Sequence, residues 1–472
     1  MSRRRLVLLL TVLALVAPSA AAGEPWAKAE YTLVMDDQVA LAATLYEPVL
    51  APPPGGYPAV VMFHGLGGDR LSMNTIAEQV FAQAGYAVLT FDARGHGTSG
   101  GLTTIDGPRE VQDVRQLHDW LAARPTVDGS RIGTWGISLG GGAVWNSIAA
   151  GVPFAASEVV ETWVDLKAAL MPNNLVKTGA VFGFLNALPS ERFAPSVLAI
   201  RADAFANRIT PALLQFGAER SAAGALRSIE TPTLIFQGRR DFAFDLTQGL
   251  TAYRLLNGPK RLFIGDFGHA PSTFPGPDAE AVFAESLKWF DIHLRGAQGI
   301  AQVPVQLSAD PWNGRVQSYG GMPPTTNVTT RLARVNKTFG ARGKTVVDFA
   351  LPARKLETFG APLVKVNAST RTQAKQLVAV LEAVSPNGTA TIVSEGGTAL
   401  GTRAKSWKLS FRLISDTALI AKGSKLRLTL SWTTTAHSAG NLLYLTGVPD
   451  GSSLTIKTAQ VTLPVLRQAV SG

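Results

Sequence analysis

The chain has 472 residues, of which 46% are hydrophobic and 17% charged, and it contains no cysteine. This composition is typical of a globular protein with two domains, and it excludes disordered chains, disulfide scaffolds and thiol nucleophiles. The net charge of +10 is uneven, because residues 301–472 hold 20 Lys and Arg against 7 Asp and Glu. These basic residues are scattered, which favours a solvated sheet face over docking on anionic polymers, and we expect no nucleic-acid partner.

The first residues indicate export. Residues 3–5 are basic, residues 6–16 form an apolar segment too short to span a membrane, and residues 20–22 resemble a cleavage site. We predict a signal peptide over residues 1–22, cleaved near Ala22, and a secreted, periplasmic or cell-surface mature protein without a transmembrane segment. The basic start is compatible with general secretion and with the twin-arginine route.

Residues 30–47 predict an antiparallel hairpin, after which short apolar runs alternate with helical segments. We expect strands at 59–63, 87–91 and 131–135, and helices at 71–84, 108–123 and 140–149. Residues 160–228 are rich in Ala, Leu and Phe and predict an inserted helical cap. The alternation resumes with strands at 233–237 and 260–264 and ends in a helix at 278–295. This pattern predicts a mostly parallel sheet with helices on both faces.

A second domain is expected after a glycine-containing linker at residues 296–299. Apolar and polar residues alternate with a period of two at 376–384, 407–413, 426–432, 454–458 and 461–465. Such alternation predicts antiparallel strands in a sandwich. The expected organisation is therefore a signal peptide at 1–22, a catalytic domain at 23–296 with its cap at about 160–228, and an all-β sandwich at 300–472.

The segment Gly-Ile-Ser-Leu-Gly at residues 136–140 lies between a predicted strand and a predicted helix, as a G-x-S-x-G nucleophile turn requires. Glycines flank Ser138 because a Cβ on either side of so tight a turn would clash. We predict Ser138 as a nucleophile and the backbone N–H of Leu139 as a donor to a developing oxyanion.

A nucleophilic serine needs a base, and the base needs an acid that orients it. Asp241 follows the strand at 233–237 and His269 follows the strand at 260–264, so both come at the carboxyl edge of the sheet. We predict His269 as general base and acid and Asp241 as its orienter. The weaker candidates are Asp245 in a following helix, Asp266 beside His269, and the remaining histidines His64, His96, His118, His293 and His437.

The loop His-Gly-Leu-Gly-Gly at residues 64–68 follows the first long parallel strand. An H-G-x turn there predicts a second oxyanion donor, the backbone N–H of Leu66. His64 lies at the same sheet edge, so we expect it to line the substrate pocket. No spacing of metal ligands and no dinucleotide or phosphate-binding loop occurs, so we expect neither a metal nor a cofactor.

The chain resembles the X-Pro dipeptidyl-peptidase and cocaine esterase family of serine hydrolases. The motifs that carry the resemblance are residues 92–95, 99–100, 113–120, 127–128, 131–141, 238–241, 268–269, 379–388 and 423–430. The resemblance implies an α/β-hydrolase domain with a helical cap, followed by a jelly-roll β-sandwich. It also implies that a small ester or an X-Pro-type peptide is cleaved through an acyl-enzyme on Ser138.

Two features bear on the substrate. Many members of that family place a tyrosine in the oxyanion loop, whereas residues 64–67 here contain none, as in simple esterases. An X-Pro dipeptidase also holds a free amine, and by position Glu161, Glu158 and Asp165 are the candidates. We expect Glu161 to bind substrate. A non-catalytic cell-surface binding protein on a hydrolase scaffold is the alternative, but an intact Ser, Asp and His in order favours the enzyme. The sequence sets no expectation for the oligomeric state.

Overall fold

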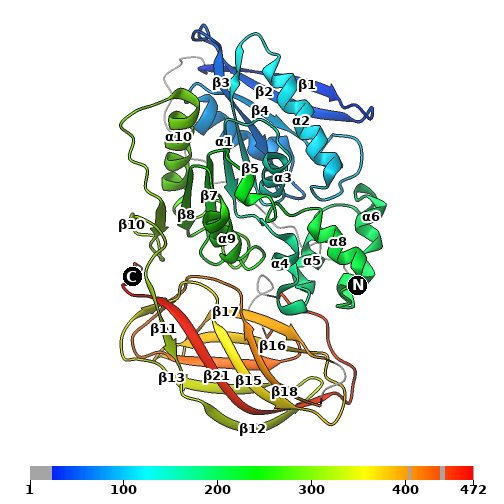
Figure 1. Ribbon diagram of the computed structural model, residues 1–472, viewed down its shortest axis with the longest axis vertical. Coiled ribbons are helices and arrows are strands. Elements are labelled where there is room, and N and C mark those ends of the chain that lie inside the picture. Colours follow the sequence, from blue (N-terminus) through cyan, green and yellow to red (C-terminus); the bar gives the residue numbers. More distant parts are fainter. Residues whose placement is uncertain (1–23, 402–404, 436–441, 471–472) are drawn as a thin grey trace.

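The computed structural model describes residues 24–401, 405–435 and 442–470. The expected signal peptide and His437 lie outside these residues. The described chain forms a sheet covered by helices, with an all-β part beside it and short helices between the two (Figure 1). None of the described helices is long and apolar enough to cross a membrane.

A ten-stranded sheet forms the framework of the first part, in the order β1-β2-β4-β3-β5-β6-β7-β8-β9-β10. Neighbouring strands from β4 through β9 pair in parallel, while β1, β2 and β10 run antiparallel at the edges. The strands are β1 (Trp26–Val34), β2 (Ala40–Pro48), β3 (Tyr57–Phe63), β4 (Ala87–Phe91), β5 (Val127–Ile137), β6 (Ala156–Val160), β7 (Thr233–Gly238), β8 (Lys260–Gly265), β9 (Val305–Ser308) and β10 (Val316–Tyr319).

Helices cover both faces of this sheet, because apolar residues emerge from both sides of the buried parallel strands. One apolar cluster joins the sheet to α2, α3 and α9, and another joins it to η2 and α10. The predicted parallel sheet with helices on both faces is confirmed. The elements are η1 (Arg70–Met73), α1 (Asn74–Ile76), η2 (Ala77–Ala82), α2 (Pro108–Ala122), α3 (Leu139–Ala149), α9 (Thr247–Leu255) and α10 (Ala279–Arg295).

Short helices between β6 and β7 build the cap, in the region where the sequence predicts one. Prolines divide them, since proline cannot continue a helix but starts one well. They are α4 (Leu166–Leu170), η3 (Pro172–Asn174), α5 (Thr178–Leu185), η4 (Ser190–Arg192), α6 (Pro195–Ala199), α7 (Arg201–Phe205), α8 (Pro211–Ala218) and η5 (Leu226–Ser228).

The sheet contains three strands that the sequence pattern does not assign. Strand β6 lies directly before the cap and merges with its apolar composition. Strands β9 and β10 follow the predicted linker at 296–299 and are only four residues each, too short to display a period. The first sheet therefore extends to Tyr319, beyond the boundary expected near residue 300.

The remaining strands form a β-sandwich. One sheet has the order β11-β21-β15-β18 with β12 also on β21, the other has the order β13-β20-β16-β17, and β14 pairs with β19. Side chains from the inner faces of both larger sheets share one apolar core. The strands are β11 (Thr325–Thr329), β12 (Ala333–Gly340), β13 (Thr345–Ala350), β14 (Leu356–Glu357), β15 (Leu363–Ser369), β16 (Gln376–Val384), β17 (Ala390–Ala399), β18 (Ser406–Arg412), β19 (Leu419–Ile420), β20 (Lys425–Ser431) and β21 (Ser453–Leu466).

The sandwich supports the cap directly. The N–H of Gly179 in α5 donates to the Leu443 carbonyl at 2.8 Å, and the Thr178 hydroxyl accepts from the N–H of Leu445 at 2.8 Å. In the neighbouring η3, the Asn173 side chain donates to the Gly397 carbonyl at 3.0 Å. These bonds hold the start of α5 in place and with it one wall of the space above the sheet.

Candidate active site

Ser138 stands at the turn between β5 and α3. Its φ of 55° and ψ of −116° form a strained conformation of the kind that projects a nucleophile from a strand-to-helix turn. A Cβ on Gly136 would lie 2.3 Å from the Gly140 carbonyl oxygen, and one on Gly140 would lie 2.4 Å from the Phe63 oxygen. The close packing within the turn at Gly136, and of the turn against β3 at Gly140, is thus the physical reason for the flanking glycines.

The structure brings Ser138, His269 and Asp241 together. The Ser138 Oγ lies 2.9 Å from His269 Nε2, and His269 Nδ1 lies 2.6 Å from Asp241 Oδ2. Asp241 follows β7, and its Oδ1 accepts a 2.9 Å bond from the N–H of Phe244. Gly268 permits the contact, because a Cβ there would lie 2.9 Å from the Asp241 Cβ. In this arrangement an imidazole can take a proton from the serine while a carboxylate fixes its tautomer.

The surroundings favour a charged imidazole on His269. Burial opposes protonation, but the charge and hydrogen bond of Asp241 and the charge of Glu161 raise the pKa of His269 to about 9. The His269 side chain is 26% exposed, whereas Asp241 is fully buried. The ion pair is therefore shielded on the carboxylate side and open on the side of Ser138, where a substrate would arrive.

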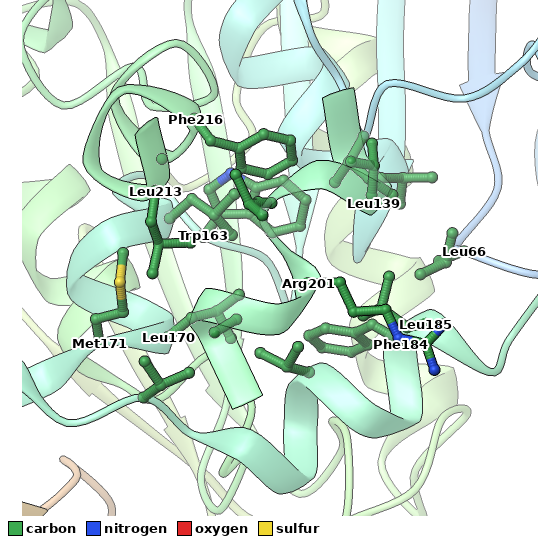
Figure 2. Close-up of a pocket in the computed structure, with 18 of the residues that line it drawn as sticks. Leu66, Leu139, Trp163, Leu170, Met171, Phe184, Leu185, Arg201, Leu213 and Phe216 are labelled. Carbon is green, nitrogen blue, oxygen red and sulfur yellow. The ribbon is translucent and has the colours of Figure 1, made fainter. Parts of the chain in front are cut away.

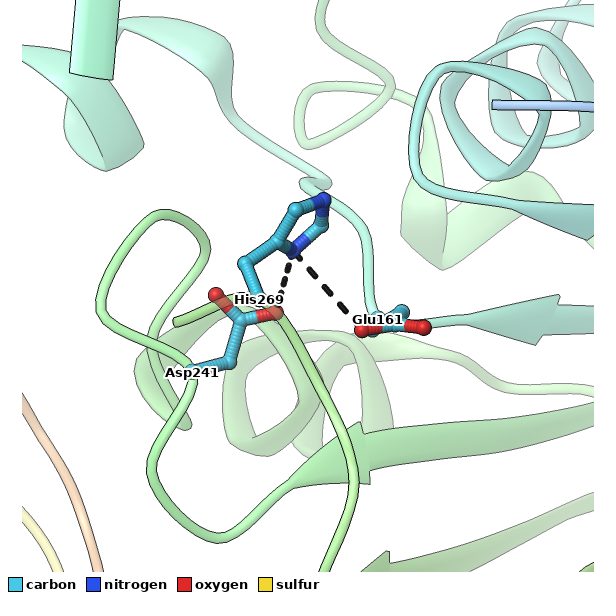
Figure 3. Close-up of side chains that lie close together, drawn as sticks. All are labelled: Glu161, Asp241 and His269. Carbon is cyan, nitrogen blue, oxygen red and sulfur yellow. Dashed lines mark hydrogen bonds and ion pairs between the residues drawn. The ribbon is translucent and has the colours of Figure 1, made fainter. Parts of the chain in front are cut away.

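Glu161 does not lie where the sequence analysis expected a substrate-binding carboxylate. Both Glu161 and Asp241 approach the Nδ1 edge of the imidazole (Figure 3), with Glu161 Oε2 3.8 Å from Nδ1. The residue is 2% exposed, and the pocket lining does not include it. Burial raises the pKa of this carboxyl, the His269 charge lowers it and the Asp241 charge raises it, giving about 8. Glu161 is thus a second buried carboxyl group beside His269.

Glu161, Asp241 and His269 also form the one group of described His, Asp and Glu side chains whose ligand atoms lie within 4.8 Å of one another. A metal ion at this point would need Nδ1 of His269 as a ligand. The 2.6 Å bond to Asp241 instead puts a proton on Nδ1, and Nε2 faces Ser138. These side chains therefore fit a chain of hydrogen bonds from Asp241 through His269 to Ser138 better than a metal site.

His64 does not line the pocket, contrary to expectation, and instead supports the loop that carries Leu66. Its Nε2 accepts a 2.9 Å bond from the N–H of Ala93, so Nδ1 carries the proton and donates to the Gly65 carbonyl at 2.8 Å. Burial lowers the pKa of His64, which keeps this tautomer neutral. Its ring packs 4.9 Å from that of His96. With both nitrogens bonded to backbone, the ring fixes the turn that precedes Leu66.

An apolar pocket adjoins Ser138, and Figure 2 shows residues that line it. Ser138, Leu139, Leu66 and Phe244 line it on the side of the sheet, and residues from cap helices α4 to α8 line most of the rest. Its free space is about 860 Å³ with the opening to solvent included, a size typical of small-molecule sites. Both predicted oxyanion donors thus belong to residues whose side chains also line this pocket.

The competing candidates have other partners. Asp245 lies just before α9, not inside a helix as predicted, and accepts a 2.8 Å bond from the N–H of Thr247. Asp266 forms a 3.0 Å ion pair with Arg240. Within the described structure neither carboxylate is bonded to His269. His118 and His293 lie in α2 and α10, as expected.

Sequence reasoning missed Lys177, which lies in the cap and is fully buried. Its ammonium donates to the carbonyls of Phe242 and Ala243 at 2.9 and 3.0 Å, in the segment that directly follows Asp241. Burial lowers the pKa of this amine. A lone lysine before a predicted helix carries no motif, so only the unusual depth of the position reveals it.

Comparison with known proteins agrees with this architecture. A sequence model of the family described as X-Pro dipeptidyl-peptidase (S15 family) matches residues 37–271. A crystal structure of a CocE/NonD family hydrolase from Staphylococcus aureus aligns with a TM-score of 0.72 at 14% identity, covering 93% of this chain and 94% of that one. An α-amino acid ester hydrolase aligns with a TM-score of 0.69 at 15% identity, covering 95% and 98%. At such identities the structures establish the fold.

Among curated sequences, an uncharacterized 31.7 kDa protein of Escherichia coli is 35% identical over 94 residues, which are 20% of this chain and 33% of that protein. The chain spans about a third of the length of the curated relatives it matches. The fold and the family match define an α/β-hydrolase fold joined to a β-sandwich. The chain belongs to the X-Pro dipeptidyl-peptidase and cocaine esterase family.

Proposed function

We propose that the protein is an exported esterase in which Ser138 is the nucleophile, His269 the general base and acid, and Asp241 the residue that orients His269. The observation that carries this proposal is the continuous run of bonds from Ser138 Oγ through the imidazole to a buried carboxylate, beside an apolar pocket. Such a run is what a serine hydroxyl needs to become nucleophilic at neutral pH.

The proposed reaction has two halves. Ser138 Oγ attacks the carbonyl carbon while its proton passes to His269 Nε2, and the backbone N–H groups of Leu139 and Leu66 bind the oxyanion. The carbon–oxygen bond to the alcohol then breaks, and His269 returns the proton to the departing alkoxide. Water, deprotonated by His269, attacks the acyl-enzyme carbonyl, and its collapse releases the acid and restores Ser138.

An ester fits this site better than an X-Pro peptide with a free amine. Glu158 is fully buried in β6 and accepts a 2.8 Å bond from the Ser286 hydroxyl. Glu161 lies behind His269, and Asp165 caps α4 by accepting from the N–H of Ala168. None of these carboxylates lines the pocket, whose only charged lining residue among those described is the cation Arg201. A substrate ammonium would therefore meet apolar side chains without an acceptor.

The test is a paired assay of the mature protein and Ser138→Ala on p-nitrophenyl butyrate and on Ala-Pro-p-nitroanilide. The proposal expects cleavage of the ester at least about 10³-fold faster than by the variant, and little cleavage of the anilide. Ser147→Ala is the matched control, because Ser147 is buried in α3 and its hydroxyl has no hydrogen-bond partner among the described residues. Preferential cleavage of the anilide would favour the peptidase. Inactivity on both, with no labelling by a fluorophosphonate, would favour the non-catalytic binding protein.

Export is proposed from the basic, apolar and small-residue pattern of residues 1–22. The check is to express the full chain in a bacterium and determine the N-terminus of the mature protein by mass spectrometry. Cleavage close to Ala22 with recovery outside the cytoplasm supports export. An intact N-terminus in the cytoplasm contradicts it.

A further inference from the structure

We infer that the apolar pocket binds the acyl chain of a linear aliphatic ester, and that the cap selects the length of that chain. This inference rests on the proposed function, because it needs the ester carbonyl at Ser138. It names the substrate class: esters of unbranched, medium-chain carboxylic acids with short alcohols.

The chemistry of the lining carries the first step. Around Ser138 the pocket is lined by Leu139 and Trp163, and at its far side by Met171 and Leu213 (Figure 2). The Trp163 indole N–H is already bonded to the Arg220 carbonyl at 2.7 Å, so it offers no donor to a ligand. A lining with so few free polar groups fits a chain of methylenes and rejects a peptide, whose amides would stay unpaired.

The two buried ends of the pocket belong to different apolar clusters. Leu139 and Trp163 pack in a cluster next to the nucleophile, whereas Met171, Ala204 and Leu213 pack in another within the cap. The pocket lies between these clusters, so a chain that extends from Ser138 would fill the space that separates them. Arg201, the charged lining residue, is exposed, so its charge is solvated and does not oppose an apolar chain.

The position of His269 decides which half of the ester, the acyl chain or the alcohol, occupies the apolar pocket. His269 must protonate the departing alcohol, so the alcohol lies beside the imidazole. The pocket lining contains Ser138 and both oxyanion residues, Leu66 and Leu139, but not His269 itself. The lining approaches the imidazole only through Phe244, whose ring packs edge-on at 5.1 Å from it. The pocket therefore extends from the carbonyl on the side away from the leaving group, which is the acyl side.

The experiment measures kcat/KM for p-nitrophenyl acetate, butyrate, hexanoate and octanoate below their micellar concentrations. Burial of a methylene is worth up to about fourfold, so we expect at least about a tenfold rise from acetate to octanoate. A second comparison uses the isomers methyl octanoate and heptyl acetate, which differ only in the side that carries the chain. We expect methyl octanoate to be preferred. A flat series, or preference for heptyl acetate, overturns the inference.

A substitution in the cap tests whether the cap causes the dependence of kcat/KM on acyl-chain length. Ala204→Phe fills the far end of the pocket from α7, and Ala202→Phe on the same helix is the control, because Ala202 is exposed and outside the lining. We expect Ala204→Phe to lose about tenfold on octanoate and less than about twofold on acetate, with the control unchanged on both. Leu213→Trp, which fills the same end from α8, gives a second reading if Ala204→Phe does not fold.

The outcomes separate the two proposals. Ser138-dependent cleavage of acetate without any rise with chain length overturns the acyl-pocket inference and leaves the esterase proposal standing. Equal losses on acetate and octanoate in both filled variants also overturn it. Cleavage of acetate that survives Ser138→Ala overturns the esterase proposal, and the inference with it.

Discussion

Arg239 and Glu357 form an ion pair that is wholly inaccessible to solvent and joins the end of β7 to strand β14. Arg239 precedes Asp241 by two residues, and its carbonyl accepts a 2.9 Å bond from the N–H of Thr417, next to β19. The segment that carries Asp241, the residue proposed to orient His269, is therefore held by the part of the chain that follows the first sheet. This link gives the distant strands a direct bearing on the geometry at His269.

The first prediction concerns this pair. Glu357→Leu leaves the Arg239 cation buried opposite an apolar group, so we expect a loss of about 3–5 kcal/mol in the free energy of unfolding. We also expect kcat to fall with little change in KM, because Asp241 loses its support. Denaturant unfolding and steady-state kinetics measure both. The double variant Arg239→Met with Glu357→Leu should regain much of the stability; a double variant no more stable than the single one would contradict the account.

The second prediction concerns pH. The general base works as neutral imidazole, and the pKa of His269 is raised to about 9, so its neutral fraction grows as the pH rises toward and beyond that value. We expect kcat/KM on a neutral ester to increase between pH 7 and 9. The midpoint of this rise should lie well above the usual pKa of histidine. The pKa of Glu161 is raised to about 8, so this carboxyl is ionised only in the upper part of that pH range. Glu161→Gln removes the charge that then lies 3.8 Å from Nδ1, and it should move the rise in kcat/KM to lower pH. A rise in wild-type kcat/KM centred near pH 6.5, or a rise that Glu161→Gln does not shift, would contradict this prediction.

The third prediction concerns stability. Burial raises the pKa of Glu158 to about 8, while hydrogen bonds from Ser286 and Trp135 lower it. Because the folded pKa exceeds the ordinary value, the unfolded chain loses this proton first, and stability falls as the pH rises from about 4.5 to 8. Glu158→Gln keeps the acceptor for Ser286 without the charge. We expect it to match the wild type at pH 4 and to exceed it at pH 9 by more than about 1 kcal/mol in urea unfolding. Equal stabilities at pH 9 would count against a buried neutral carboxyl.

The fourth prediction concerns the nucleophile turn. A methyl group at Gly140 would lie 2.4 Å from the backbone oxygen of Phe63, which cannot move aside as a side chain could. We expect Gly140→Ala to cost about 1–3 kcal/mol and to lower kcat by about 10²-fold through displacement of Ser138. Gly183→Ala in α5 is the control, since a Cβ there has open space, and it should be neutral or slightly stabilising. Equal effects of the two substitutions on kcat would disprove the steric argument.

The sequence predicted the parts of the molecule that have a local signature. The apolar runs at β3, β4 and β7 have the length and flanking turns of buried strands, and β18 shows a clear period of two. The expected alternation at 376–384 is not seen, because β16 is buried along nearly its whole length. The glycines beside Ser138 indicated the turn, and the chain order Ser138, Asp241, His269 predicted that these residues lie together, as they do in the structure.

The remaining features depend on contacts between distant segments. His64 was expected to line the pocket because it follows a predicted strand at the carboxyl edge of the sheet, and Glu161 was expected to bind substrate only by its position near the cap. The direction of a side chain within a turn is set by its tertiary partners, such as the N–H of Ala93 for His64. Likewise, the buried ion pair of Arg239 and Glu357 joins residues 118 positions apart. No local sequence motif predicts this pairing.

The most direct test of the account is to identify the residue that becomes acylated. The protein is mixed with p-nitrophenyl butyrate, quenched in acid within the first turnovers, and mapped by peptide mass spectrometry. The account predicts a butyryl group on Ser138, absent from Ser138→Ala and present in the control Ser147→Ala. Sustained hydrolysis with the acyl group on another residue, or undiminished turnover in Ser138→Ala, would contradict it.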